Sequence, residues 1–412
     1  MKAGIISIGN ELLSGQTVDT NAAWLAGQLF EKGMATVGSW TVPDEQARIV
    51  SAIGQAATEG ALILITGGLG PTDDDVTRQA VAAWLEVELE FHPELLTQIT
   101  AFFEKRGKKM APKNRSQAFL PAGSTALDNP LGTAPGVWAC KDRTLLAVMP
   151  GVPAEMKRMF TEQVLPRIAH STKGPAVVSR KLRCFGAGES DIAQKLGDLM
   201  KRGRNPLINC TCGSGEIVLH IVATADEPGT ARSMIEADKH RIRECLGDWV
   251  YGQDDQTLPA LVGELLRARH KTIAVAESCT GGLLSKMLTD IPGASAYVKA
   301  GWVTYSDQSK SAQLQVPESL VAECGAVSEP VARAMARQAA QRSGAEVAVS
   351  ITGIAGPGGG TDSKPVGLVY IALEIDGQCE VKECRFPPSN RHWVRLRSAL
   401  TALNWVRLRL QV

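Results

Sequence analysis

The stretch TIAVAESCTGG, residues 272–282, decides the fold of this chain, and the helical pattern LLSKML follows it at residues 283–288. A short β-branched run, then small residues, then helical periodicity predicts a strand, a tight turn and a helix. Such a turn presents the Ser278 hydroxyl at a helix N-terminus, where unpaired N–H groups and the helix dipole favour developing negative charge. Ser278 could then attack a carbonyl carbon while neighbouring amides receive the oxyanion. The alternative is a serine that only caps the helix.

Bulk composition narrows the class of protein. A length of 412 residues predicts about two to four domains. A formal net charge of +1 argues against electrostatic binding to nucleic acid or membranes. No apolar stretch is long enough to span a bilayer, and Met1 leads into a strand rather than a signal-peptide core. Nine cysteines without paired spacing indicate reduced thiols, so we expect a cytoplasmic protein.

Three segments follow one another along the chain. Residues 1–170 and 257–412 alternate buried strands with helices, which predicts parallel sheets with ligands at the carboxyl ends of the strands. Residues 176–252 read as a compact α+β module, and a polar link at 252–256 follows it. The predicted fold class is therefore α/β: two separate α/β domains with mainly parallel sheets, joined by a small α+β, KH-like middle domain. We expect that middle domain to be a spacer or a subunit contact, because its helix is mixed in charge and it offers no aromatic stacking platform. An RNA-binding module is the alternative.

Two further side chains lie at the end of the predicted strand 297–305 of the third segment or shortly after it. Tyr305 and Lys310 should emerge at the same sheet edge as Ser278. A lysine in a desolvated pocket has a lowered pKa and can replace histidine as a base. This matters because the six histidines are scattered and form no recognisable catalytic arrangement. The alternatives are a strand-end aromatic for Tyr305 and a solvated charge for Lys310.

A glycine-rich loop at 353–360 follows the predicted strand 345–352. Its free amides suit a phosphate or a close ligand, although the Gly-Lys-Ser/Thr ending of a P-loop is missing. Arg391 and Arg395, one turn apart on the last predicted helix, could reach a phosphate. Exposed arginines on a helix are the alternative.

The first segment carries a second polar loop, TGGLGPTDDD at residues 66–75, after the strand 61–66. It predicts an anion-binding turn beside carboxylates, and magnesium-like ions take carboxylate and phosphate oxygens together. Glu11 on a neighbouring loop and the run 113–115 (KNR) favour a nucleotide or pyrophosphate pocket. The alternative is an acidic helix N-terminus stabilised by the helix dipole.

Five motifs of the third segment resemble the CinA carboxyl-terminal domain: residues 276–282, 303–306, 325–329, 350–357 and 364–367. Members of that family are nicotinamide mononucleotide deamidases. The resemblance implies hydrolysis of the carboxamide to nicotinate mononucleotide and ammonia, without a cofactor, with Ser278 as nucleophile and Tyr305 and Lys310 as its activating partners. The expected substrate-binding residues are Cys279, Thr280, Gly281, Gly282, Thr352, Gly353, Gly356, Arg391 and Arg395.

The first segment resembles the molybdopterin-binding-like domain of the same family through residues 9–15, 19–21, 67–77 and 150–153. In that family the domain is associated with metal-dependent ADP-ribose pyrophosphatase activity, which yields AMP and ribose 5-phosphate. The implied ligands of a divalent metal, Mg²⁺ or similar, are Glu11, Asp74 and Asp75; many relatives carry Asp at the position of Asn10. The implied nucleotide-binding residues are Asn21, Gly67, Gly68, Gly70, Thr72, Lys113, Asn114, Arg115 and Gly151.

The sequence is therefore interpreted as a bifunctional pyridine-nucleotide hydrolase of NAD metabolism. Its expected partners are small nucleotides, with no membrane and no direct nucleic acid, and a homodimer is expected. Two alternatives stay open. The amino-terminal domain could bind a nucleotide or pterin without catalysis, or the whole protein could be a competence or DNA-damage accessory that acts through protein partners.

Overall fold

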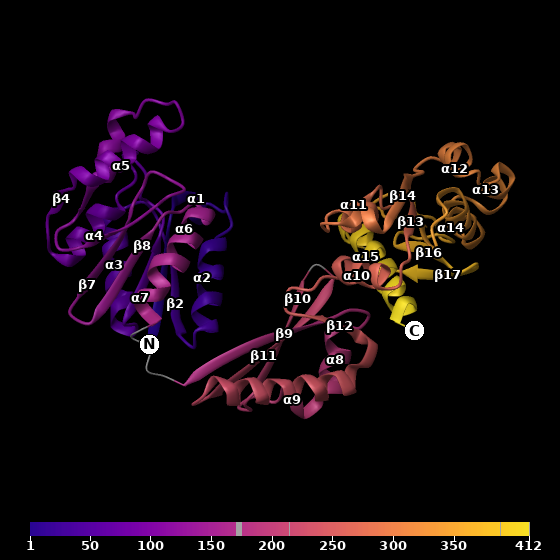
Figure 1. Ribbon diagram of the computed structural model, residues 1–412, viewed down its shortest axis with the longest axis horizontal. Coiled ribbons are helices and arrows are strands. Elements are labelled where there is room, and N and C mark those ends of the chain that lie inside the picture. The colour runs from indigo at the N-terminus through magenta and orange to yellow at the C-terminus, as the bar shows by residue number, and fades with distance from the viewer. Residues whose placement is uncertain (170–174, 214, 388, 412) are drawn as a thin grey trace. The chain divides into compact units, whose positions relative to one another are not determined.

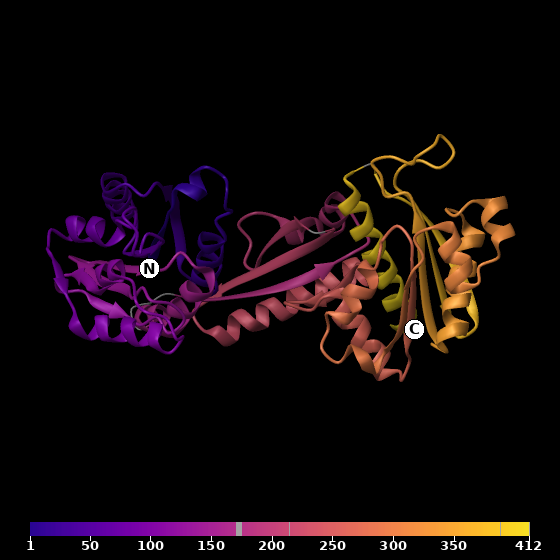
Figure 2. The ribbon, with the colours of Figure 1, turned by 90° about the horizontal axis from the view of Figure 1, so that it is seen from above.

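The computed structural model describes residues 1–169, 175–213, 215–387 and 389–411 (Figures 1 and 2). The chain divides into two compact units: Met1–Val178 with Thr224–Arg232, and Ser179–Ala223 with Ser233–Val412. The boundary predicted near 171–175 falls largely on residues 170–174, outside the described part. Within the described ranges, no helix combines the length and apolar character that crossing a membrane requires.

Unit 1 is an α/β domain built on one large sheet and a two-stranded one. Its strands are β1 (Lys2–Ile8), β2 (Ala35–Val42), β3 (Leu62–Thr66), β4 (Leu89–Phe91), β5 (Phe119–Pro121), β6 (Thr125–Leu127), β7 (Gly136–Lys141) and β8 (Thr144–Met149). Its helices are α1 (Asn10–Leu13), α2 (Thr20–Glu31), α3 (Gln46–Glu59), α4 (Thr77–Leu85), α5 (Pro93–Glu104), η1 (Pro112–Ala118), α6 (Pro153–Met159), η2 (Phe160–Val164) and α7 (Leu165–Ala169).

The large sheet of unit 1 has the order β2-β1-β3-β8-β7-β6. The pairings β1–β2, β1–β3 and β3–β8 are parallel, whereas β8–β7 and β7–β6 are antiparallel. Successive residues of a strand point to opposite faces. Ile6 and Ile63 therefore pack under α3 and α4, while Ile5 and Leu64 pack under α2 and α6. Burial on both faces explains the continuous apolar runs of β1 and β3.

The middle module contains a four-stranded sheet with two helices. Its elements are β9 (Ala176–Cys184), α8 (Glu189–Leu196), η3 (Gly197–Met200), β10 (Leu207–Gly213), β11 (Glu216–Ala225), α9 (Pro228–Leu246), η4 (Gly247–Trp249) and β12 (Val250–Gln253). The strand order is β10-β11-β9-β12. β10 is not predicted from the sequence; it is an edge strand in which Ile208 alone is fully buried. Its remaining residues carry too little apolar alternation to indicate a strand.

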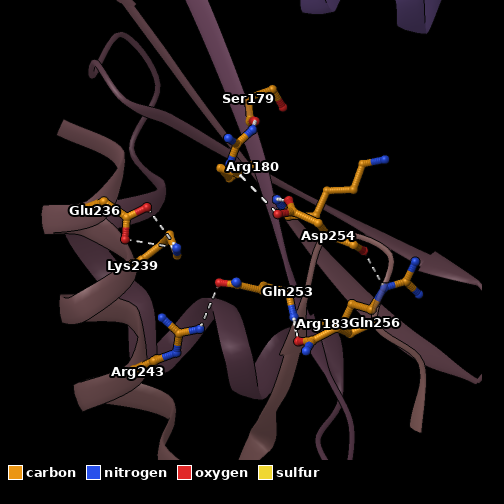
Figure 3. A network of polar contacts seen from close by, with 10 residues as sticks. Ser179, Arg180, Arg183, Glu236, Lys239, Arg243, Gln253, Asp254 and Gln256 are labelled. Carbon is orange, nitrogen blue, oxygen red and sulfur yellow. Dashed lines mark hydrogen bonds and ion pairs between the residues drawn. The ribbon is translucent and has the colours of Figure 1, made fainter. Parts of the chain in front are cut away.

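The link after the middle module is firmly structured (Figure 3). The Asp254 carboxylate accepts the Lys181 N–H at 3.1 Å and lies 3.8 Å from the Arg180 guanidinium. The Asp254 carbonyl accepts from the Arg183 Nε at 2.7 Å, and Gln253 contacts Arg243. The polar residues predicted as a mere link thus extend the pairing of β12 with β9.

The carboxyl-terminal domain is again α/β. Its strands are β13 (Ile273–Glu277), β14 (Val298–Val303), β15 (Val347–Gly353), β16 (Leu368–Ile375) and β17 (Gln378–Arg385). Its helices are α10 (Leu258–Ala268), α11 (Leu283–Thr289), η5 (Ala294–Ala296), α12 (Asp307–Leu314), α13 (Glu318–Cys324), α14 (Glu329–Ser343) and α15 (Arg391–Gln411). The predicted strand 297–305 ends at Val303, so Tyr305 lies beyond it.

This second sheet has the order β14-β13-β15-β16-β17. β13 pairs in parallel with β14 and β15, and the next two pairings are antiparallel. One face, including Val275 and Val349, packs on α10 and α15, while Ala276 and Ala348 face α14. Both large sheets are mixed, and in each the parallel strands end at one edge with their polar loops. The predicted α/β class is confirmed. In each domain, the candidate site lies at the edge of the sheet where the parallel strands end.

A substitution at Gly67 tests the backbone conformation of the glycine-rich loop that follows β3 in unit 1. Its φ is +107°, and an added methyl group would overlap the Ile8 carbonyl oxygen. Gly67→Ala should therefore destabilise unit 1 by ~3 kcal/mol or more. Thermal and urea unfolding of the wild type and of Gly67→Ala measure this loss in the free energy of unfolding.

Gly54 provides the control. It lies inside α3, and no described atom would come within 4 Å of an added methyl group. Because alanine is the better helix former, Gly54→Ala should leave stability unchanged or raise it by up to about 1 kcal/mol. Equal stabilities for both alanine variants would contradict the loop geometry.

Candidate active sites

The Ser278 turn follows β13 directly. The Ser278 N–H donates to the Ile351 carbonyl at 2.9 Å, which continues the parallel register of β13 with β15. Gly281 and Gly282 then take φ values of +57° and +88°, which reverse the chain into α11. Ser278 is 8% exposed. The strand, turn and helix predicted from the sequence are all present.

Glu277 holds the other side of this turn and was missed as a functional residue. Its carboxylate is fully buried and accepts the N–H groups of Leu284 and Ser285 at 3.0 and 2.8 Å, as well as the Ser285 hydroxyl. A carboxylate is favourable at a helix N-terminus, where the first amides lack partners. Glu277 thereby fixes the angle between β13 and α11. A charged residue inside an otherwise apolar strand was the available signal.

Lys310 lies against the serine. It is 1% exposed, and its ammonium donates to Ser278 Oγ at 3.3 Å and to the Thr304 carbonyl at 3.0 Å. Ser306 caps α12 by accepting the Ser309 N–H, which turns Lys310 inward. Burial lowers the pKa of Lys310, and the Asp307 carboxylate, 3.9 Å away, partly opposes this shift. Lys310 is thus no solvated surface charge.

Tyr305 is exposed and is not part of the buried pair of Ser278 and Lys310. Its side chain is 57% exposed, and its hydroxyl accepts from the Arg391 guanidinium. The same guanidinium donates to the Gly356 carbonyl at 3.0 Å. Arg391 therefore ties the loop after β14 to the loop after β15. Among the described residues Tyr305 has no hydrogen bond with Ser278 or Lys310, and its activating role stays a prediction.

Arg395 binds the serine turn from α15. Its Nε and Nη2 donate to the Thr280 carbonyl at 3.2 and 2.6 Å. Cys279 is buried, and burial raises the pKa of its thiol to about 12, which makes it a poor nucleophile. The Thr352 hydroxyl donates to the Ala326 carbonyl at 2.8 Å, and Gly353 ends β15. Arg391 and Arg395 thus both donate to backbone carbonyls. Phosphate binding by either arginine stays a prediction.

Two hydroxyl groups beside the pair lack partners. Thr280 and Thr304 are fully buried, and neither hydroxyl has a hydrogen-bond partner among the described residues. Buried polar groups are normally satisfied. Within the described part of the chain, these two hydroxyls are therefore free to bond a polar group beside Ser278 and Lys310.

The glycine-rich loop of unit 1, residues 67–75, follows β3 and leads into α4. Asp75 closes it, since its carboxylate accepts the Gly70 and Thr72 N–H groups at 2.7 and 2.9 Å, together with the Thr72 hydroxyl. Gly68 has φ +63° and leaves no room for a side chain against Thr77. This loop is therefore fixed by internal hydrogen bonds.

A small cavity of about 100 Å³ lies at the same edge of the sheet, lined in part by Ser7, Glu11, Asn21 and Gly151. Asn21 Nδ2 donates to Thr66 Oγ1 and to the Gly151 carbonyl at 3.0 and 2.7 Å. Asn21 Oδ1 and Ser7 Oγ have no partner in the described part of the chain. The predicted residues Asn21 and Gly151 are thus brought together. A larger cavity of about 930 Å³ lies against α5 and contains none of the predicted site residues.

The predicted metal ligands do not form a ligand set. Among the described residues, no three acidic, histidine or cysteine side chains are arranged to hold a metal ion. Asp75 is occupied by loop amides, and Asp74 is exposed. Asp44, which sequence analysis missed, accepts the Asn10 N–H at 2.9 Å; its pKa is raised by burial and by the charges of Glu11, Asp74 and Asp75. As placed, these carboxylates do not fit a bound divalent metal.

The predicted run 113–115 forms part of η1 and divides into three roles. Lys113 pairs with Asp73 at 2.9 Å on the surface. Asn114 is buried and donates to Gln117, which itself donates to the Leu69 carbonyl. The Arg115 guanidinium stacks on the Phe91 ring, 4.7 Å from its centroid. Lys113 is held beside the glycine-rich loop by its ion pair with Asp73. Nucleotide binding by all three residues stays a prediction.

Three family models match the chain. The CinA C-terminal domain matches residues 255–410, the probable molybdopterin binding domain matches residues 4–170, and the damage-inducible protein CinA KH domain matches residues 179–252. Similar solved structures include CinA from Thermoplasma acidophilum, with 31% identity, TM-score 0.38, and coverage of 41% of this chain and 97% of that one. A competence/damage inducible protein from Agrobacterium tumefaciens has 39% identity, TM-score 0.35, and coverage of 38% and 99%.

Full-length relatives give the stronger comparison. A putative competence-damage inducible protein from Moorella thermoacetica is 43% identical over 414 residues, covering 100% of both chains. A CinA-like protein from Geobacter sulfurreducens is 42% identical over 412 residues, covering 100% of this chain and 99% of its own. Together with the three domain matches, this likeness over the whole length confirms that the chain belongs to the CinA family.

Proposed function

We propose that the carboxyl-terminal domain hydrolyses the carboxamide of nicotinamide mononucleotide to nicotinate mononucleotide and ammonia. The observation that supports this best is the buried contact between Lys310 Nζ and Ser278 Oγ at 3.3 Å. A desolvated lysine beside a serine supplies a nucleophile and a base without histidine. The substrate class comes from the family resemblance, since the pair itself suits any amide or ester.

The proposed reaction has two halves. Ser278 Oγ attacks the carboxamide carbon while neutral Lys310 takes its proton, and the carbonyl oxygen becomes an oxyanion. The backbone amides of Cys279 and Thr280, which no other described residue occupies, would receive that charge. The C–N bond then breaks, and Lys310 returns the proton to the departing ammonia. Water, deprotonated by the same lysine, finally hydrolyses the ester on Ser278.

Ser278→Ala should reduce ammonia release from nicotinamide mononucleotide by several orders of magnitude, because it removes the nucleophile of a coupled pair. Ser309→Ala is the matched control, since that hydroxyl only bonds the Ser306 carbonyl on α12. A chelator should leave wild-type ammonia release unchanged, because serine and lysine need no metal for this chemistry. Near-normal turnover of Ser278→Ala would sink the proposal.

The pH profile tests Lys310 as the base. The base must be neutral, so turnover should rise as pH increases through its pKa, which burial lowers. Asp307→Asn removes the charge that raises this pKa, so the acidic limb of kcat/KM should move to lower pH. Asp290→Asn, which only loses a surface pair with Lys286, should leave the limb in place. A limb that stays fixed in Asp307→Asn would contradict the assignment.

We propose that unit 1 binds ADP-ribose through the glycine-rich loop and hydrolyses it to AMP and ribose 5-phosphate. The loop supports this with unpaired backbone amides at a parallel sheet edge, where α/β domains bind ligands. Because the carboxylates do not fit a metal as placed, no step of this reaction is assigned to one. The metal requirement implied by the resemblance stays a prediction.

Asp75→Asn should lower both ADP-ribose binding and AMP formation by at least tenfold, because an amide cannot accept all the hydrogen bonds that order the loop. Asp73→Asn, which loses only an exposed pair with Lys113, should show no such loss. Calorimetry and AMP detection measure the two effects separately. Wild-type binding without AMP at any metal concentration would leave unit 1 a binding module, and AMP formation in the presence of a chelator would remove the metal requirement.

A further inference from the structure

Arg78 is a buried cation behind the glycine-rich loop. It is the second residue of α4 and is 2% exposed. Its Nη1 donates to the Leu69 carbonyl at 2.7 Å, and its Nη2 donates to the Gly70 carbonyl at 3.0 Å. In the described ranges, no carboxylate lies within 4.0 Å of this guanidinium, although Asp75 acts on it from farther away. Burial lowers its pKa to about 10, so the group stays charged at neutral pH.

The first four carbonyls of the loop, those of residues 67–70, are bonded by residues at the start of α4. Thr77 donates from Oγ1 to the Gly67 carbonyl at 3.0 Å and from its N–H to the Gly68 carbonyl at 3.3 Å. Arg78 holds the next two carbonyls, those of Leu69 and Gly70. Four consecutive carbonyl groups are therefore bonded by two adjacent residues at the start of one helix, and Gln117 adds a longer bond of 3.3 Å to the Leu69 carbonyl.

The opposite ends of the same peptide groups face away from α4. In a trans peptide the N–H points opposite to the C=O. The N–H groups of Gly68, Leu69 and Gly70 are therefore directed to the other side of the loop. Asp75 takes the Gly70 N–H at 2.7 Å, while those of Gly68 and Leu69 have no partner among the residues the structure describes. Successive free amides form a concave nest for an anion.

We propose that Arg78 is the positioning residue of this anion site: its fork fixes the loop carbonyls so that the Gly68 and Leu69 amides face a phosphate group of the ligand. The inference rests on the proposed function of unit 1 and adds to it both the residue and the part of the ligand bound. The guanidinium touches the loop and not the phosphate. Its positive charge also raises the potential at the nest and opposes the charge of the Asp75 carboxylate on the Gly70 amide.

The two Nη groups of Arg78 explain why an arginine, and not a lysine, suits position 78. A planar guanidinium presents several N–H groups at fixed angles and can hold two carbonyls at once, whereas an ammonium is a compact point charge. Arg78→Lys should therefore keep the charge and lose part of the geometry. Arg78→Met fills similar space but loses both.

The test measures binding of inorganic pyrophosphate to the full-length chain by calorimetry. Arg78→Met should weaken pyrophosphate binding at least tenfold, and Arg78→Lys should lose affinity severalfold but less than the methionine variant. Arg407→Met is the matched control. Arg407 is equally buried in the other unit and donates to the Asp248 carbonyl at 2.6 Å, so its loss should leave pyrophosphate binding unchanged. Thermal unfolding and ammonia release by each variant report whether the chain has folded.

Affinity of a folded Arg78→Met within twofold of wild type would overturn the inference. If that variant does not fold, Arg78→Lys decides, and wild-type affinity there would overturn it equally. Wild-type protein that binds neither pyrophosphate nor ADP-ribose would overturn the proposed function of unit 1 together with this inference. Pyrophosphate binding that depends on Arg78, without AMP formation, would support the positioning role and contradict only the hydrolysis.

Discussion

The contact between Lys310 and Ser278 is the interaction on which the carboxyl-terminal site depends. An ammonium that is 1% exposed is held by one hydroxyl and one carbonyl, and its pKa is lowered because water is excluded. The surrounding elements keep this arrangement in place. Glu277 fixes α11 behind the serine, and the Ser306 cap turns α12 so that the lysine points inward. Arg395 ties the serine turn to α15.

The two large domains share one arrangement at the sheet edge but use a different buried cation in it. In each, parallel strands end at one edge, a glycine turn enters a helix, and a buried cation lies beside the turn. In the carboxyl-terminal domain that cation is a lysine, whose pKa burial can bring into the range where it exchanges protons. In unit 1 it is Arg78, which stays charged and engages two loop carbonyls. The choice of cation fits proton transfer at one edge and anion binding at the other.

Much of this could be predicted from the sequence because strand runs and glycine turns are local signals. β13, the serine turn, α14 and the loop after β3 follow from apolar periodicity and small residues. The edge strand β10 was not predictable, because its pairing with β11 supplies the order that its own polar residues lack. The roles of Glu277, Asp44 and Arg78 were missed for another reason. Each acts through backbone groups: Asp44 through an amide far away in the chain, and Glu277 and Arg78 through groups on the other side of a turn. Those contacts exist only once the turn or the sheet has formed.

Tyr305, Asp74 and Asp75 show that a sequence can predict where a polar side chain lies without predicting its hydrogen-bond partner. The spacing predicted Tyr305 at the same sheet edge as Ser278. The strand ends at Val303, and the Tyr305 hydroxyl accepts a hydrogen bond from Arg391, which the spacing did not predict. Asp75 carries charge next to Asp74, yet its oxygens serve the loop amides. A position at the right sheet edge therefore does not decide which partner a polar side chain takes. Hydrogen bonds with nearby backbone groups decide it.

The central claim is that Ser278 becomes covalently acylated during turnover. Rapid acid quenching of the enzyme with nicotinamide mononucleotide, followed by peptide mass spectrometry, tests this directly. If Ser278 is the nucleophile, the peptide that contains it should gain the mass of a nicotinate mononucleotide acyl group during the steady state. Turnover with full ammonia release and no adduct on that peptide, under quench times shorter than one cycle, would contradict it.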